Sequence, residues 1–350
     1  MRGLFALALL ALAAASPAPP LGPVVDAAVA KGFEGVVLTG DAREVSFERA
    51  VGVADRATGR AHRVGDRWPW ASVTKQVVAT LVMQEVEQGR LTLETPLARA
   101  LPAFKGPTAA QVTIRQLLQH VSGLPDPSAT PEDANGVEAF YRTPLGPSAA
   151  TGFCAGPGAT APSGKFLYNN CDYLVLGAVL ERSSSKPLAQ LIAERTRLPL
   201  TLPADAVGFP TPQRGYLDGS KPAPLVRLAT FGAAGALIGR PRDLLAFDRA
   251  LLANRLLTQP ARDVLWKGDP KLGYEALGQW SFPAKLAGCA GPVQVIERQG
   301  DIAGIQVRNY IAPATGRILI VFTNRADVDF GQLWQGKGLG YDLASAAFCA

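Results

Sequence analysis

The sequence predicts an α+β fold, an α/β sandwich in which an antiparallel sheet is flanked by helices and carries an inserted, mainly helical lobe. Strand-like apolar patterns occur near both ends of the chain, at residues 32–52 and 293–324, and helical spacing dominates the stretch between them. Strands from the two ends are therefore expected to form one sheet. We expect the sheet lobe to comprise about residues 30–70 and 280–350, and the helical lobe about residues 71–279.

Residues 1–18 are typical of a signal peptide. The positively charged Arg2 precedes an uncharged apolar run that ends at Ala15, and small residues follow. Cleavage after Ala15 or after Ala18 fits the preference for small residues, and the sequence does not choose between them. The run is too short to span a bilayer, and no later stretch is long enough. We therefore expect residues 19–350 to be periplasmic or secreted, without a stable membrane span.

The first strands are predicted as a hairpin. Apolar residues at 36–38 and 45–47 flank the turn-forming pair at 40–41. Farther on, valines and leucines recur at helical spacing until Gly89 ends the pattern. Ser72 lies at the start of this helix.

The remaining elements follow from the same periodicities. Helical patterns in the middle of the chain occur at residues 114–120, 173–183, 188–195 and 242–257. Near the end, apolar or alternating segments predict three antiparallel strands, at residues 293–299, 305–312 and 317–324. A last helix, at about residues 333–348, is expected to cover one face of the sheet.

Composition argues against a nucleic-acid partner. The formal net charge is +6, but arginines and lysines are scattered among acidic residues and form no basic run. Hydrophobic residues make up 48% of the chain, as in a globular protein. We expect a monomer that acts on a small molecule.

The four cysteines predict two disulfides, because an even number in an exported protein is usually paired. We favour Cys154 with Cys171 and Cys289 with Cys349, since the first pair would close a segment rich in glycine and proline. The two other pairings remain possible from the sequence alone.

Several familiar sites are absent or incomplete. The chain has only two histidines, His62 and His120, so it cannot form a metal site of the H-E-x-x-H kind, and no metal or organic cofactor is expected. Residues 146–150 lack the second glycine of G-x-S-x-G, and residues 331–337 have P-loop spacing but are followed by Gly338 instead of serine or threonine. His120 lies at the predicted end of a helix, which suits a capping role better than catalysis.

Ser72 and Lys75 form the S-x-x-K pattern of a serine nucleophile with a lysine base. Residues three apart on a helix share one face, so the two side chains should meet. Free backbone N–H groups at the helix start can stabilise the oxyanion that forms when the hydroxyl attacks a carbonyl. Lys75 must lose its charge to act as a base, and burial between two lobes could cause this.

Three motifs in order resemble those of the penicillin-recognising serine hydrolases. They lie at residues 70–76 (WASVTKQ), 114–125 (IRQLLQHVSGLP) and 168–170 (YNN). The similarity points to the subgroup of class C β-lactamases, D-alanyl-D-alanine carboxypeptidases and related esterases, and it runs from about Gly32 to the end of the chain. It implies a β-lactamase/transpeptidase-like fold for the serine hydrolase domain at residues 19–350.

The resemblance also implies roles for the motif residues. Ser72 attacks the substrate, and Lys75 and Tyr168 carry its proton. Asn170 binds the lysine and the amide of the substrate. Without the two motifs before it, Tyr168 would more often be a buried aromatic residue whose hydroxyl is satisfied.

The family carries one more motif on the strand beside the active site, which reads Lys or His, any residue, then Gly. Residues 298–300 (RQG) occupy its place. By resemblance, the backbone N–H of Asp301, just after Gly300, joins that of Ser72 in holding the oxyanion. Arg298 departs from the pattern: it can fork two hydrogen bonds to a substrate carboxylate, but it cannot relay a proton. An ordinary strand arginine, paired with a neighbouring carboxylate, is the alternative interpretation.

These residues predict an exported serine hydrolase that acts through an acyl-enzyme. Small esters or D-amino-acid amides and peptides rank first as substrates, and β-lactams second, because Arg298 stands where those lactamases carry lysine. The alternatives are a class C-like β-lactamase and a non-catalytic envelope protein that binds peptidoglycan fragments.

Overall fold

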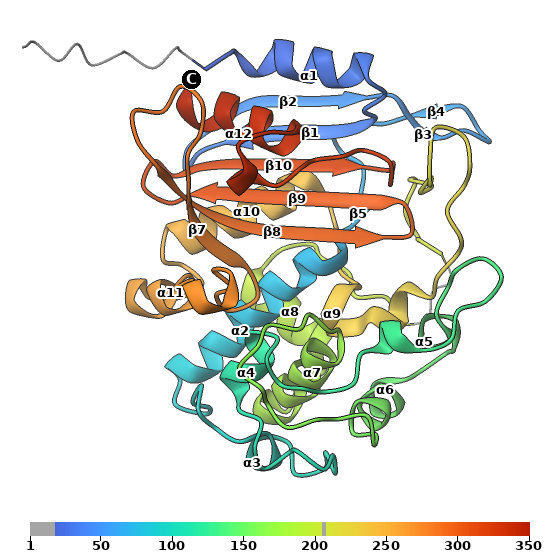
Figure 1. Ribbon diagram of the computed structural model, residues 1–350, viewed down its shortest axis with the longest axis vertical. Coiled ribbons are helices and arrows are strands. Elements are labelled where there is room, and N and C mark those ends of the chain that lie inside the picture. Colours follow the sequence, from blue (N-terminus) through green and yellow to red (C-terminus); the bar gives the residue numbers. More distant parts are fainter. Residues whose placement is uncertain (1–17, 205–207) are drawn as a thin grey trace, which may run out of the picture.

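The computed structural model describes residues 18–204 and 208–350, and within these ranges the chain has the predicted α+β architecture (Figure 1). Of the expected signal peptide, only Ala18 belongs to the described residues. Among the described helices, none combines the length and apolar character needed to cross a membrane.

One antiparallel sheet of six strands forms the core of the sheet lobe, in the order β2-β1-β10-β9-β8-β7. The strands are β1 (Gly35–Gly40), β2 (Val45–Val51), β7 (Trp280–Ala284), β8 (Val293–Ile302), β9 (Ile305–Ala312) and β10 (Arg317–Thr323). The strand β1 lies between β2 and β10, and Gly35 is opposite Thr323. Segments from both ends of the chain therefore complete the sheet, as predicted.

The two faces of the sheet carry different helices. One face packs against α1 (Leu21–Ala30) and α12 (Leu339–Cys349), and the other against α10 (Pro241–Leu252) (Figure 1). Alternation along β1 explains this arrangement, because Val37 joins the core beneath α1 and α12 while Val36 and Leu38 join the core on the other side. Thus α10, although it comes from the stretch expected in the helical lobe, covers the sheet.

The helical lobe is built around α2 (Thr74–Glu87) and α7 (Cys171–Ser184), which pack against each other. Smaller helices surround this pair: α3 (Leu97–Ala100), α4 (Ile114–Leu118), α5 (Ala139–Arg142), α6 (Pro147–Cys154), α8 (Leu188–Thr196), α9 (Gly232–Gly235) and α11 (Gln259–Leu265). Two short ladders complete the fold: β3 (Val53–Asp55) with β4 (Arg60–Ala61), and β5 (Trp68–Pro69) with β6 (Ile238–Gly239).

Three predicted helices were wrong at their ends. The helix expected to reach residue 120 stops at Leu118, because His120 has a φ of 55° in the left-handed region. The helix expected to reach residue 257 ends at Leu252, and Asn254 takes the left-handed conformation there. The last helix begins at Leu339 rather than near residue 333, since Gly338, with a φ of 98°, separates it from a short 3-10 turn.

Both disulfides have the favoured pairing, Cys154 with Cys171 and Cys289 with Cys349. The second bond joins the connection between β7 and β8 to the last residue but one of the chain, and so fastens α12 against the sheet.

Replacing both Cys289 and Cys349 with serine should destabilise the fold, because the disulfide closes a loop of 60 residues in the unfolded chain. We expect the free energy of unfolding to fall by about 2 to 4 kcal/mol, measured by urea unfolding at fixed pH. Mass spectrometry should confirm that Cys154–Cys171 remains oxidised in the variant. An unchanged unfolding midpoint would contradict this stabilising role.

Candidate active site

Ser72 and Lys75 meet at the start of α2, as their spacing predicts. Ser72 lies in a 3-10 turn, Ala71–Val73, that leads into the helix, and its side chain is partly exposed. The Lys75 side chain is fully buried, and its Nζ lies 3.2 Å from Ser72 Oγ. An accessible hydroxyl is therefore in contact with an inaccessible amine.

Two oxygen atoms fix the direction of the Lys75 amine. Nζ donates hydrogen bonds to Asn170 Oδ1 and to the backbone oxygen of Ala234, both at 2.7 Å. A neutral amine has two N–H donors and one lone pair, so these two acceptors use both of its hydrogen atoms. The lone pair is then left for the third neighbour, the Ser72 hydroxyl.

The surroundings of Lys75 favour that neutral form. Burial lowers the pKa of Lys75 well below its ordinary value, and the positive charge of Arg298 lowers it further. Asp172, Asp126 and Glu275 act in the opposite direction, but more weakly than burial. Burial thus favours the neutral amine, which is the form that the S-x-x-K interpretation requires.

Tyr168 is the second polar partner of the nucleophile. Its hydroxyl lies 2.6 Å from Ser72 Oγ and accepts a hydrogen bond of 3.1 Å from Arg298 Nη2. Desolvation raises the pKa of Tyr168, although Arg298 opposes the shift. The phenol therefore keeps its proton near neutral pH and can donate it toward Ser72 Oγ.

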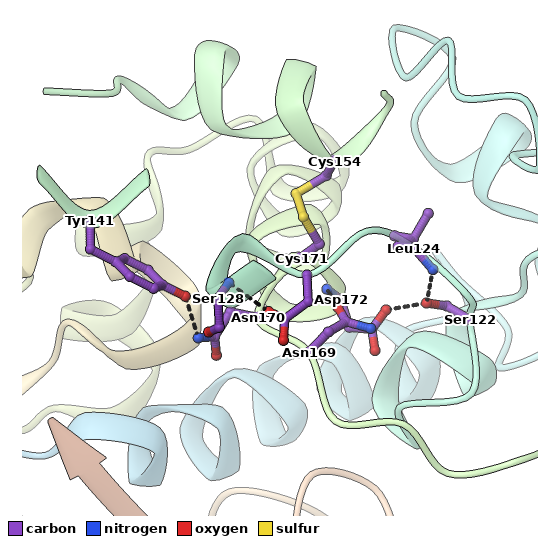
Figure 2. Close-up of a disulfide and its surroundings, with 10 residues drawn as sticks. Ser122, Leu124, Ser128, Tyr141, Cys154, Asn169, Asn170, Cys171 and Asp172 are labelled. Atoms are coloured by element: carbon purple, nitrogen blue, oxygen red, sulfur yellow. Dashed lines mark hydrogen bonds between the residues drawn. A yellow bond between two sulfur atoms is a disulfide. The ribbon is translucent and has the colours of Figure 1, made fainter. Parts of the chain in front are cut away.

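Asn170 connects this site to the helical lobe. It precedes α7, and while its Oδ1 accepts from Lys75, its Nδ2 donates to Tyr141 Oη at 2.6 Å. Figure 2 shows the Asn170 side chain facing Tyr141, next to the Cys154–Cys171 disulfide. The disulfide thus joins the end of α6 to the residue that follows Asn170.

A cluster of buried polar side chains, His120, Ser122 and Asp172, packs beside the loop that carries Tyr168. Asp172 accepts a hydrogen bond from the Ser122 hydroxyl (Figure 2), and it lies 3.0 Å from His120 Nδ1. The backbone N–H of Leu167 donates to the His120 oxygen at 2.8 Å. Burial lowers the pKa of His120 well below its ordinary value, and the permanent charge of Arg298 lowers it further. His120 positions the loop that carries Tyr168, in keeping with the structural role expected for it.

The Arg298 side chain extends from β8 to Ser72 and Tyr168. Its side chain is only 2% exposed, Nε donates to the Ser72 backbone oxygen at 3.0 Å, and Nη2 donates to Tyr168. The rings of Tyr168 and Trp280 lie beside the guanidinium. Nη1 is buried and has no hydrogen-bond partner among the described residues. Substrate binding by Arg298 stays a prediction, and it would have to use Nη1.

Gly300 and Asp301 pass close to the nucleophile on β8. A Cβ atom at Gly300 would lie 2.9 Å from Ser72 N and 2.7 Å from Trp70 O, so only glycine allows the strand this approach. Asp301 lines the cavity beside Ser72, and its carboxylate pairs with Arg308 Nη1 at 3.1 Å. Strand β8 therefore passes directly beside the nucleophile, and the oxyanion role of the Asp301 N–H stays a prediction.

The cavity in front of Ser72 has a volume of about 300 Å³. The cavity is lined by Ser72, Tyr168 and Asn170, and by the stacked rings of Tyr141 and Phe231. This size suits a small molecule or the end of a peptide. Sequence reasoning missed Tyr141 and the Ala234 oxygen, because neither belongs to a pattern with a local chemical signal.

The chain is similar to several known proteins. Esterase EstB of Burkholderia gladioli is 34% identical over 168 residues, which are 45% of this chain and 42% of EstB. The chain therefore matches less than half the length of this relative.

Two solved structures share the fold. The D-amino acid amidase from Ochrobactrum anthropi SV3 has a TM-score of 0.72 at 23% identity, over 87% of this chain and 90% of that chain. A D-stereospecific amidohydrolase from a Streptomyces species has a TM-score of 0.73 at 24% identity, over 94% and 98% of the two chains.

The family model described as Beta-lactamase matches residues 24–339. This range contains the S-x-x-K pair, the Tyr168 loop and all six strands of the sheet. The chain therefore belongs to the beta-lactamase family, the serine hydrolases that its three sequence motifs resemble.

Proposed function

We propose that the protein is a serine acyl hydrolase that acts through an acyl-enzyme on small esters or on D-amino-acid amides and peptides. One observation carries the proposal: the buried Lys75 amine has both of its N–H groups occupied, by Asn170 and Ala234, and has Ser72 Oγ as its remaining polar neighbour. This is the arrangement that a lysine base needs in order to activate a serine hydroxyl.

The reaction follows from these contacts in two stages. Ser72 Oγ bonds to the substrate carbonyl carbon as its proton moves to neutral Lys75, and the bond to the leaving group breaks as Tyr168 supplies a proton to it. The proton on Lys75 then returns to the Tyr168 oxygen. In the second stage, a water molecule attacks the acyl carbon and gives a proton to Lys75 or Tyr168. The ester bond to Ser72 Oγ then breaks, and Oγ receives a proton from the same two residues.

The oxyanion of each stage would be held by the backbone N–H groups of Ser72 and Asp301. The close approach of Gly300 to Ser72 N supports this assignment, because it brings β8 within reach of a group bound at Ser72. Preorganised N–H donors of this kind typically contribute about 3 kcal/mol to transition-state stabilisation.

The substrate class is inferred from the relatives and from Arg298. EstB is by name an esterase, and the structural neighbours are an amidase and an amidohydrolase specific for D-amino acids or D-configured substrates. The intact contacts among Ser72, Lys75 and Tyr168 argue against the non-catalytic alternative. β-Lactam hydrolysis ranks second, because the cationic group behind the nucleophile is an arginine that already binds Ser72 O and Tyr168.

We also infer that the protein works in the periplasm or outside the cell. All four cysteines are paired in two disulfides, which form and persist in oxidising compartments. The apolar run near the N-terminus of the sequence supports the same location.

Labelling of Ser72 tests the nucleophile. We expect the purified protein to form one covalent adduct with a fluorophosphonate, detected by intact-mass spectrometry, and to hydrolyse p-nitrophenyl butyrate. Ser72→Ala should form no adduct and lose at least about a thousandfold in kcat/KM. Ser163→Ala changes an exposed serine that does not line the cavity and should still be labelled. Equal labelling of Ser72→Ala, or no turnover by the unaltered protein, would contradict the proposal.

The pH profile tests the control of Lys75 by Arg298. Lys75 must be neutral to act as a base, so kcat/KM should rise with pH through the lowered pKa of Lys75 and then level off. Replacing Arg298 with glutamine removes a charge that lowers this pKa, so the rise of kcat/KM should move to higher pH, and kcat/KM at any pH on the rise should fall.

Arg298→Lys is the matched control, because it keeps the positive charge and should leave the rise near its original pH. Measurement of kcat/KM for p-nitrophenyl butyrate between pH 5 and 10 distinguishes the two variants. Identical profiles for Arg298→Gln and Arg298→Lys would show that the charge of Arg298 does not control Lys75.

A further inference from the structure

We propose that the active-site cavity takes acyl groups that carry a primary ammonium, and that the carboxylate of Glu138 binds this ammonium. The inference rests on the proposed function and extends it, because it specifies the charge of the acyl part of the substrate. The proposal distinguishes two kinds of enzyme. One kind hydrolyses D-aminoacyl substrates whose amino group is free, and the other recognises a carboxylate on the substrate.

The first support is the charge of the cavity wall. Glu138 and Asp301 are its two charged lining residues in the part of the chain that the structure describes, and both are acidic. This contrasts with the whole chain, whose formal net charge is +6. Any carboxylate of this wall that has no cationic partner in the protein attracts a cationic substrate and repels an anionic one.

The second support is that one of these two carboxylates is paired with a protein cation and the other is not. Asp301 pairs with Arg308 of strand β9, whose guanidinium also donates to the backbone oxygens of Gly300 and Val307. The half-buried carboxylate of Glu138 forms no hydrogen bond or ion pair with any residue in the described ranges 18–204 and 208–350. A partly desolvated carboxylate that faces a cavity without a protein partner gains most from a cationic ligand.

The loop that carries Glu138 is held in place before any ligand binds. Ala139 N donates to Pro131 O at 2.8 Å, and the backbone N–H of Val137 donates to Asp133 Oδ1 at 3.0 Å. Arg142 Nε donates to Val137 O at 3.0 Å from the following helix. The carboxylate is therefore presented by ordered backbone, which lowers the entropic cost of binding.

The neighbouring wall fits the remainder of such an acyl group. Tyr141 and Phe231 stack with ring centroids 3.9 Å apart, and both line the cavity, as do Val137 and Val226. These surfaces suit an apolar or aromatic side chain, and aromatic faces also attract an ammonium. A free aminoacyl group with an apolar side chain offers both features to the same wall.

Arg298 does not provide the opposite specificity. Its Nε and Nη2 donate to Ser72 O and Tyr168 Oη, and it is not among the residues that line the cavity. Among the described residues no arginine or lysine lines the cavity, so a carboxylate on the acyl group would meet the unpaired carboxylate of Glu138.

The test compares three acyl groups on one leaving group: D-phenylalanine 4-nitroanilide, its N-acetyl derivative and its N-succinyl derivative. For the unaltered protein, kcat/KM should be at least tenfold higher for the free amine than for the N-acetyl compound, and lowest for the succinyl compound. In Glu138→Gln the ratio between free amine and N-acetyl compound should fall at least fivefold, mainly through KM. In Glu138→Lys the order of free amine and succinyl compound should reverse.

Glu132→Gln is the matched control, because Glu132 lies on the same loop but is exposed and does not line the cavity. It should keep the ratios of the unaltered protein. An unchanged ratio in Glu138→Gln, or a preference of the unaltered protein for the acetyl or succinyl compound, would overturn the proposal.

A binding measurement separates this proposal from the proposed function. In the Ser72→Ala background, calorimetry should detect D-phenylalanine amide binding at least fivefold more tightly than in the Ser72→Ala/Glu138→Gln variant. If p-nitrophenyl butyrate is hydrolysed but this difference is missing, the Glu138 proposal fails and the hydrolase stands. If no substrate is hydrolysed but the difference is present, the hydrolase proposal fails and Glu138 remains an ammonium site.

Discussion

The whole site depends on the burial of one amine. Lys75 is completely enclosed between α2, the start of α7 and the segment at α9, and an uncompensated charge there would cost several kcal/mol. The fold therefore selects the neutral form. Once the amine is neutral, its two donors and single lone pair determine where Asn170, Ala234 and Ser72 must lie. Burial, which is usually a matter of stability, here produces a base.

The same constraint explains why two lobes are needed. Asn170 and Ala234 belong to the helical lobe, whereas Arg298 comes from strand β8 of the sheet and donates hydrogen bonds to the Ser72 oxygen and to the Tyr168 hydroxyl. A permanently charged guanidinium close to a buried amine makes the ammonium form still less favourable. Arg298 therefore contributes to the chemistry through its field, even though it cannot exchange a proton. The sheet supplies electrostatics, and the helical lobe supplies the hydrogen-bond acceptors.

The sequence predicted what depends on local geometry. The contact of Ser72 with Lys75 follows from the helical repeat, and the pairing of strands from both ends follows from alternation. The Ala234 oxygen and Tyr141 could not be predicted, since backbone groups and single aromatic residues carry no periodic signal. The direction of Arg298 depends on packing around β8. Asn254 did offer a signal for a helix end, because asparagine adopts the left-handed conformation more readily than most residues. Strand β7 was missed because it is short and contains Pro283.

The position of β1 between β2 and β10 has a consequence for the order of events during synthesis. The N-terminal hairpin emerges first, yet one edge of β1 stays unpaired until Thr323, opposite Gly35, has been made. Such distant pairing makes folding slow, and the open edge exposes backbone groups to other chains in the meantime. β8, which carries Arg298 and Asp301, reaches its place through the same late step. The chain can therefore acquire its site only after β8, β9 and β10 have been synthesised, and a product truncated before β8 would lack Arg298 and Asp301.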